Sequence, residues 1–123
     1  MASILVADDE LNVRQLLRRI LEKAGHRVTE ANDGEQVMAR LHEKKFDLVI
    51  IDVVMPIKGG IETLIDMRED FRGIKIIIIS GKVDTSSTAF TNLTAHFGAQ
   101  RVMRKPFETE QLLREVNSLL AEA

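Results

Sequence analysis

Five polar residues that could do chemistry together each stand at the end of an apolar segment. Asp8 and Asp9 follow ILVA, Asp52 follows LVII, Ser80 follows IIII, and Lys105 follows QRVMR, a segment with two apolar residues. Three carboxylates brought close together repel one another, and at neutral pH one keeps a proton unless a cation intervenes. Magnesium is a hard cation that takes a few carboxylates together with water and phosphate oxygens. The residue types therefore predict a magnesium site with a lysine and a hydroxyl group beside it.

Asp52 is the residue that a purely structural role explains least well, because an unpaired carboxylate directly after four apolar residues is costly to desolvate. A carboxylate can act as a nucleophile, as in enzymes that form an aspartyl-phosphate. Lys105 would then supply positive charge against the phosphoryl oxygens, and Ser80 a hydroxyl donor. For Asp8–Glu10 a second interpretation stays open, since an acidic helix start is favoured by capping and by the helix dipole.

Short β-branched segments alternate with amphipathic segments along the whole chain. The expected strands are Ser3–Asp8, His26–Ala31, Phe46–Asp52, Ile74–Ser80 and Gln100–Arg104. Apolar residues at helical spacing predict five helices: Leu16, Leu17, Ile20, Leu21 and Ala24; Val37, Met38 and Leu41; Ile61, Leu64 and Ile65; Ala89, Phe90, Leu93 and Phe97; Leu112, Leu113, Val116, Leu119 and Leu120. We expect these stripes to pack in the core, with Gly25 and Gly98 ending the first and fourth helices.

This alternation predicts an α/β fold with right-handed crossovers. A closed barrel of eight units needs far more than 123 residues, so the sheet is expected to be open. We expect one domain over residues 1–123, with a flavodoxin-like parallel sheet of five strands in the order 2-1-3-4-5 and helices on both faces. In such sheets ligands bind at the carboxyl ends of strands 1 and 3, which would bring the polar residues above into one crevice.

Composition narrows the function classes. The chain carries 17 basic and 19 acidic residues and has neither a basic stripe nor Trp or Tyr, so direct nucleic-acid binding is not expected. It has no cysteine, so disulfides and thiolate metal sites are excluded. Neither a secretory signal nor an apolar run of about 20 residues is present, which predicts a cytoplasmic protein without a membrane span.

Four motifs at the strand ends together resemble a known family: VADDE (Val6–Glu10), IIDVVMP (Ile50–Pro56), IIIISG (Ile76–Gly81) and RKPF (Arg104–Phe107). Along its whole length the chain resembles a receiver domain of two-component response regulators, of the single-domain kind typified by the chemotaxis regulator. The resemblance implies a phosphoacceptor switch that takes a phosphoryl group from a sensor histidine kinase or a histidine phosphotransfer protein. It implies catalysis only of the domain's own phosphorylation and dephosphorylation.

The resemblance also implies roles for individual residues around the metal. Asp52 matches the phosphoacceptor, and Asp9 matches the direct Mg²⁺ ligand. Asp8 matches the acidic neighbour that often acts through water, and the backbone carbonyl of Val54 matches the third protein ligand. Because Val54 offers no polar side chain to orient an attacking water, we hypothesise a phosphoryl lifetime longer than in receivers with a polar residue there; an unchanged dephosphorylation rate in Val54→Asn would contradict this.

On the other side of the expected pocket, Ser80 matches the hydroxyl switch residue and Gly81 the small residue whose N–H holds the phosphoryl group. Lys105 matches the family's lysine, and Lys105-Pro106 resembles the cis peptide that aims it. The implied output is a change in the face formed by the fourth helix, the fifth strand and the fifth helix, which would bind a downstream protein. A monomer or a phosphorylation-dependent dimer is compatible with this.

Three features depart from the family pattern. Val102 stands where the family usually carries an aromatic ring that couples to the hydroxyl switch. Gly59 stands where aspartate is common, and the stretch between Ser80 and Lys105 is long and rich in Thr and Ser, which are mediocre helix formers. Three alternatives stay open: a flavin-binding module, a magnesium phosphohydrolase with Asp52 as its nucleophile, and a receiver that docks partners without phosphorylation.

Overall fold

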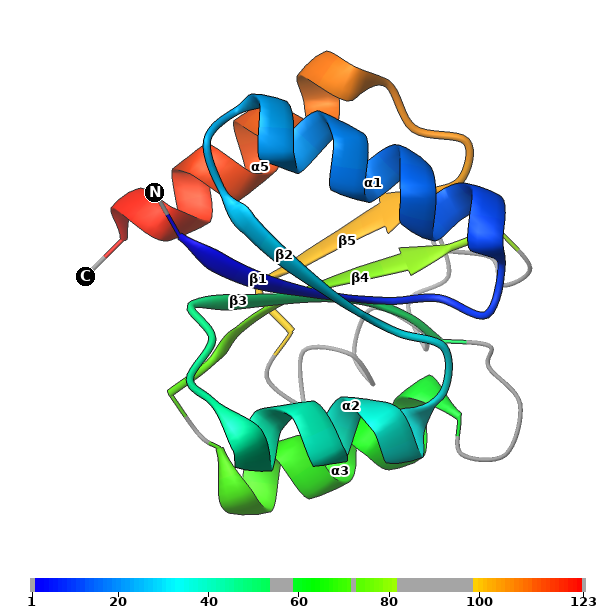
Figure 1. The fold of residues 1–123 in the computed structure, drawn as a ribbon, viewed down its shortest axis with the longest axis vertical. Coiled ribbons are helices and arrows are strands. Elements are labelled where there is room, and N and C mark those ends of the chain that lie inside the picture. Colours follow the sequence, from blue (N-terminus) through cyan, green and yellow to red (C-terminus); the bar gives the residue numbers. More distant parts are fainter. Residues whose placement is uncertain (1, 54–58, 72, 82–98, 123) are drawn as a thin grey trace.

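The chain forms a five-stranded parallel sheet with helices on both faces (Figure 1). The computed structural model describes residues 2–53, 59–71, 73–81 and 99–122. Its elements are β1 (Ser3–Ala7), α1 (Leu11–Lys23), β2 (Arg27–Ala31), α2 (Gly34–Glu43), β3 (Leu48–Asp52), α3 (Gly60–Asp70), β4 (Lys75–Ser80), β5 (Arg101–Arg104) and α5 (Thr109–Ala121). The strand order is β2-β1-β3-β4-β5, which confirms the predicted topology.

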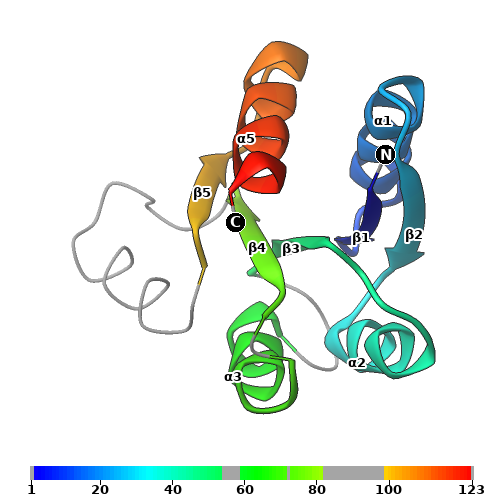
Figure 2. The same ribbon diagram turned by 90° about the vertical axis from the view of Figure 1, so that its left-hand side faces the viewer.

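Successive strand residues point to opposite faces of the sheet, so the side chains of each apolar strand pack alternately into two separate hydrophobic cores, one on each face. Ile4 and Val6 of β1 pack in the cluster that contains the apolar side chains of α1 and α5. Leu5 and Ala7 pack in the cluster that contains those of α2 and α3. The two helix pairs lie on opposite sides of the sheet in both ribbon views (Figures 1 and 2). Burial on both faces explains why the three inner strands, β1, β3 and β4, are almost continuously apolar.

Gly25 ends α1 as the sequence predicted. Its φ angle is 96°, a left-handed conformation that glycine adopts without steric cost. The Gly25 N–H donates to the Glu22 carbonyl and the His26 N–H donates to the Leu21 carbonyl, the two bonds of a Schellman motif. No helix in the described part of the chain is long and apolar enough to cross a membrane.

Some details of the predicted elements were wrong. The strands are one or two residues shorter than expected at their beginnings or ends; β3, for example, begins at Leu48 rather than Phe46. Three members of the predicted core stripes face solvent: Leu16 is 43% exposed, Ile65 is 38% exposed, and Ala24 is also exposed. All three lie at the margin of a stripe, where helical spacing alone does not tell which side a neighbouring element covers. The predicted fourth helix with Gly98 lies outside the described residues.

Candidate functional site

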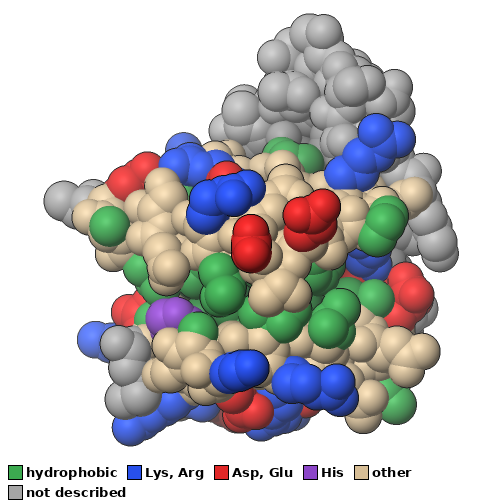
Figure 3. All heavy atoms as spheres, turned by 90° about the horizontal axis from the view of Figure 1, so that it is seen from above, with side chains coloured by type: hydrophobic (Ala, Val, Ile, Leu, Met, Phe, Trp, Pro, Cys, Tyr) green, Lys and Arg blue, Asp and Glu red, His purple; other side chains and the backbone are tan. Residues whose placement is uncertain are grey.

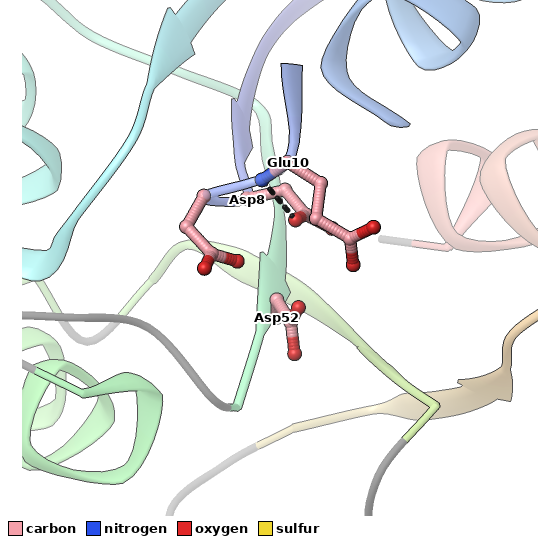
Figure 4. A group of neighbouring side chains, drawn as sticks. Asp8, Glu10 and Asp52 are labelled. Atoms are coloured by element: carbon pink, nitrogen blue, oxygen red, sulfur yellow. Dashed lines mark hydrogen bonds between the residues drawn. The ribbon is translucent and has the colours of Figure 1, made fainter. Parts of the chain in front are cut away.

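Four carboxylates gather at the carboxyl edge of the sheet. Asp52 closes β3 and is 5% exposed, whereas Asp8 lies one residue past β1 and is fully buried. Asp9 and Glu10 follow at the surface. One oxygen from each of these four residues lies within 4.8 Å of the others, and the labelled side chains of Figure 4 surround a common space. The structure thus brings together the acidic residues that the sequence predicted and adds Glu10.

Lys105 reaches into this group from the segment after β5. Its Nζ lies 2.7 Å from Asp8 Oδ2, 2.8 Å from Asp52 Oδ2 and 3.3 Å from Glu10 Oε1. Burial lowers the pKa of Lys105, but the hydrogen bond with Asp52 and the close contact with Asp8 outweigh burial and leave the pKa above its ordinary value. The lysine therefore carries a fixed positive charge between the two buried carboxylates.

The two oxygens of Asp8 have different surroundings. Oδ1 accepts a hydrogen bond of 2.9 Å from the Glu10 N–H, drawn as a dashed line in Figure 4. Oδ2 is buried and, within the described residues, lacks a hydrogen bond of normal geometry although it faces the Lys105 ammonium. Burial raises the pKa of Asp8, against the lowering effects of Lys105 and of the Glu10 N–H. An all-oxygen set with one incompletely satisfied buried oxygen fits a hard divalent cation such as Mg²⁺.

Ser80 and Gly81 lie beside this group at the end of β4. Ser80 is fully buried, and its carbonyl accepts a hydrogen bond of 2.9 Å from the Lys105 N–H. A Cβ atom added to Gly81 would lie 3.2 Å from Lys105 Cβ, so a larger residue here would crowd the lysine. The peptide between Lys105 and Pro106 is cis, as predicted. Val54, whose carbonyl was predicted to bind metal, lies outside the described residues.

Comparison with known proteins gives the family. A family model described as the response regulator receiver domain matches residues 4–117. The chain belongs to this family. It is 32% identical over 123 residues to the response regulator receiver protein CpdR of Brucella abortus, and both chains are covered in full. It is 33% identical over 122 residues to the transcriptional regulatory protein ResD of Bacillus subtilis, but it spans only 48% of that protein.

Solved structures of receivers have the same fold. The chemotaxis protein CheY4 of Vibrio cholerae superposes with a TM-score of 0.89 at 29% identity, covering 97% of this chain and 98% of CheY4. The response regulator TrrA of Thermotoga maritima, solved in complex with Mg²⁺ and BeF, superposes with a TM-score of 0.83 at 29% identity, covering 97% and 99% of the two chains. Receiver domains are regulatory rather than classical enzymes, and response regulators interact with histidine kinases and downstream targets. The family membership decides against the flavin-binding and phosphohydrolase interpretations.

The receiver's fifth strand carries the main departure from the family pattern. Val102 lies on β5 and is 36% exposed, while its neighbour Met103 is buried. Arg101 forms ion pairs with Glu115 of α5 and with Glu122, the residue that follows this helix. The Thr- and Ser-rich stretch that follows Gly81 lies outside the described residues.

Two residues near the site were missed by sequence reasoning. Gly60 begins α3, and a Cβ atom there would lie 2.5 Å from both the Asp52 carbonyl oxygen and Val53 Cα. Its only signal in the sequence was the Gly59-Gly60 pair, which reads as a turn. Arg14 donates a hydrogen bond of 2.7 Å to the Asp8 carbonyl. Nothing in the sequence distinguished this arginine from the other charged residues of α1.

Proposed function

We propose that this receiver domain, formed by residues 1–123, accepts a phosphoryl group on Asp52 from a phosphohistidine in the presence of Mg²⁺. The observation that carries the proposal is the shared lysine. Lys105 Nζ contacts both Asp52 and Asp8 within a group of four carboxylates, so positive charge already stands where phosphoryl oxygens would arrive. Catalysis of phosphoryl transfer consists mostly of such positioning and charge stabilisation.

Each residue then has a separate task in the transfer. The carboxylate of Asp52 attacks phosphorus, and the bond between phosphorus and the donor's imidazole nitrogen breaks as the new oxygen–phosphorus bond forms. Asp8, Asp9, Asp52 and the Val54 carbonyl would hold Mg²⁺, which when bound supplies positive charge against the phosphoryl oxygens. Lys105 provides a second positive charge next to Asp52 and Asp8. The Ser80 hydroxyl and the Gly81 N–H would donate hydrogen bonds to the transferred group.

The same contacts explain how the domain acts as a switch. In the structure the Lys105 ammonium lies 2.8 Å from the unphosphorylated carboxylate of Asp52 and balances its charge. Phosphorylation replaces this carboxylate with a bulkier, more highly charged group, so the Lys105 contact has to rearrange. Lys105 is also bonded through its N–H to Ser80 and continues directly from β5. A change at Asp52 would therefore shift the balance between conformations of the predicted output face, for which the structure describes β5 and α5 and which would bind the downstream target.

The surface next to the site suits a helical phosphohistidine donor. Figure 3 looks onto α1 and α5, where a band of hydrophobic side chains runs between charged margins. Two hollows lie along these helices: one of about 440 Å³ lined in part by Val13, Leu16 and Phe107, and one of about 490 Å³ lined in part by Leu16, Ile20 and Leu113. The first also contains Lys105, so a donor seated there would present its histidine to the acidic group.

A cytoplasmic location of the protein and its self-catalysed dephosphorylation remain predictions from the sequence.

Intact-mass analysis after incubation with a small-molecule phosphodonor and Mg²⁺ tests the proposal. We expect a phosphoryl-sized gain for the wild type and for the control Asp70→Ala, which removes an exposed carboxylate of α3. Asp52→Ala should show no gain. A gain in Asp52→Ala, or the lack of a gain in the wild type, would overturn the assignment of Asp52.

A further inference from the structure

Arg14 is a largely buried positive charge near the N-terminal end of α1, which is an unusual place for a cation. Its N–H donates to the Glu10 carbonyl at 3.1 Å, so it belongs to the beginning of α1. The helix dipole disfavours a cation at this end, and the first turn of α1 contains no acidic residue to offset it. Its side chain is nevertheless only 14% exposed. Specific partners outside the first turn must therefore stabilise this position.

Those partners are a backbone carbonyl and a carboxylate. Arg14 Nη1 donates to the Asp8 carbonyl at 2.7 Å, and Nε donates to Glu30 Oε1 at 3.1 Å. Glu30 lies on β2, the edge strand beside β1, and also pairs with Arg18. A guanidinium group is a planar fork that can serve two acceptors at fixed angles, which a lysine ammonium does less well.

The bond to the carbonyl completes a set of restraints around Asp8. Asp8 lies one residue beyond β1, where the regular hydrogen-bond ladder ends, and a buried carbonyl there still needs a donor. The Asp8 N–H donates to the Ala31 carbonyl at 3.1 Å, its carbonyl accepts from Arg14, and its Oδ1 accepts from the Glu10 N–H. With these three groups held, Oδ2 is the part of Asp8 left to face Lys105 and Asp52.

We propose that Arg14 is a positioning residue of the acidic group. It holds the Asp8 carbonyl and so keeps the Asp8–Glu10 segment aimed at Asp52, while Glu30 holds the guanidinium in place from β2. The inference concerns the geometry of the acidic segment; its relevance to phosphoryl transfer rests on the proposed function. If Arg14 only paired with Glu30 at the sheet edge, it would be equivalent to Arg18, which also pairs with Glu30 but whose other hydrogen bonds go to Glu22 and to the Val28 carbonyl.

Arg18 therefore provides the matched control. We would compare Arg14→Gln, Arg14→Lys and Arg18→Gln by amide hydrogen exchange without metal and by calorimetric titration with Mg²⁺. Arg14→Gln should accelerate exchange of the Glu10 amide relative to core amides such as Leu21 by about tenfold, the effect of losing one hydrogen bond. It should weaken Mg²⁺ binding by about tenfold or more, as is typical when a residue that orients a metal ligand is removed.

Arg14→Lys should be intermediate in both measurements, and Arg18→Gln should resemble the wild type. Equal effects of Arg14→Gln and Arg18→Gln, or no change in the ratio of Glu10 to Leu21 exchange in Arg14→Gln, would overturn the proposal. The exchange measurement needs no metal and no phosphodonor. It therefore decides the role of Arg14 even if the wild type fails to bind Mg²⁺ or to be phosphorylated, which would overturn the proposed function instead.

Discussion

Replacing Gly60 with alanine should disturb Asp52, the proposed phosphoacceptor, more than the fold. A Cβ atom at this position would lie 2.5 Å from the Asp52 carbonyl oxygen and from Val53 Cα. Ordinary contacts begin near 3.4 Å, so the start of α3 and the end of β3 must separate by roughly 0.9 Å. The obstructing atoms are backbone, so no side-chain rotation can relieve the clash. The displaced segment carries Asp52 itself.

The size of both effects follows from this displacement. Overpacking costs about 1–3 kcal/mol, and the better helix propensity of alanine returns at most about 1 kcal/mol, so we expect a net loss on the order of 1–2 kcal/mol. A misplacement of about 1 Å at a reacting group can lower a rate by roughly 100-fold. We therefore expect Gly60→Ala to remain folded at 25 °C and to be phosphorylated about two orders of magnitude more slowly.

Two other glycines separate stability from site geometry. Gly25→Ala should cost about 1 kcal/mol because φ is 96° there, but it lies at the end of α1 away from the acidic group and should leave the phosphorylation rate unchanged. At Gly73 an added Cβ meets no atom within 4 Å, so Gly73→Ala should alter neither property. Stability would be measured by urea unfolding followed by far-UV circular dichroism, since the chain has no Trp or Tyr. A wild-type phosphorylation rate in folded Gly60→Ala would refute the reasoning.

Two further predictions concern charge. Lys105→Gln removes the cation that the buried carboxylates of Asp8 and Asp52 share, so the metal-free variant should lose about 3 kcal/mol of unfolding free energy and recover part of it in Mg²⁺. The control Lys45→Gln changes an exposed lysine and should leave the unfolding free energy unchanged. No loss in Lys105→Gln would contradict the ion-pair geometry. Burial lowers the pKa of His26, whose Nδ1 accepts from the Ala2 N–H, so the folded state binds fewer protons than the unfolded state near this pKa. Its contribution to stability should be complete above about pH 6.5 and lost as pH falls towards the folded pKa, and urea titrations across this range should show a slope that His26→Gln reduces.

The convergence of Asp8, Asp52 and Lys105 could be predicted from the sequence because parallel strands place their carboxyl ends at one edge. Continuous apolar runs identified β1 and β3 as central strands, and the polar residues that follow these two runs and β5 marked the carboxyl edge of the sheet. Gly25 was equally predictable, since a glycine after an apolar helical stripe is a common helix end. These predictions depend only on local pattern and on the connection rules of α/β folds.

Other features of the fold and the site depend on tertiary contacts between elements. The local sequence pattern does not encode these contacts. The exposure of Leu16 and Ile65 depends on how far neighbouring elements extend over each helix. The contact of Gly60 with the end of β3 depends on the path of a loop, and a glycine pair signals a turn without showing what approaches it. Arg14 looked like any charged residue of an amphipathic helix, because its role arises from a backbone carbonyl that carries no sequence signature.

Signal transmission in this receiver has to be explained without a bulky ring at position 102. Val102 is partly exposed on β5, and its small β-branched side chain has few rotamers, so a rotamer change that follows a movement of Ser80 is restricted. Lys105 links Ser80 and Asp52 more directly, since its backbone N–H donates a hydrogen bond to the Ser80 carbonyl and its side-chain ammonium pairs with the Asp52 carboxylate. Because Arg101 fastens β5 to α5, a displacement of Lys105 would move strand and helix together. Lys105 is therefore better placed than Val102 to couple Asp52, the proposed phosphoacceptor, to the proposed output face.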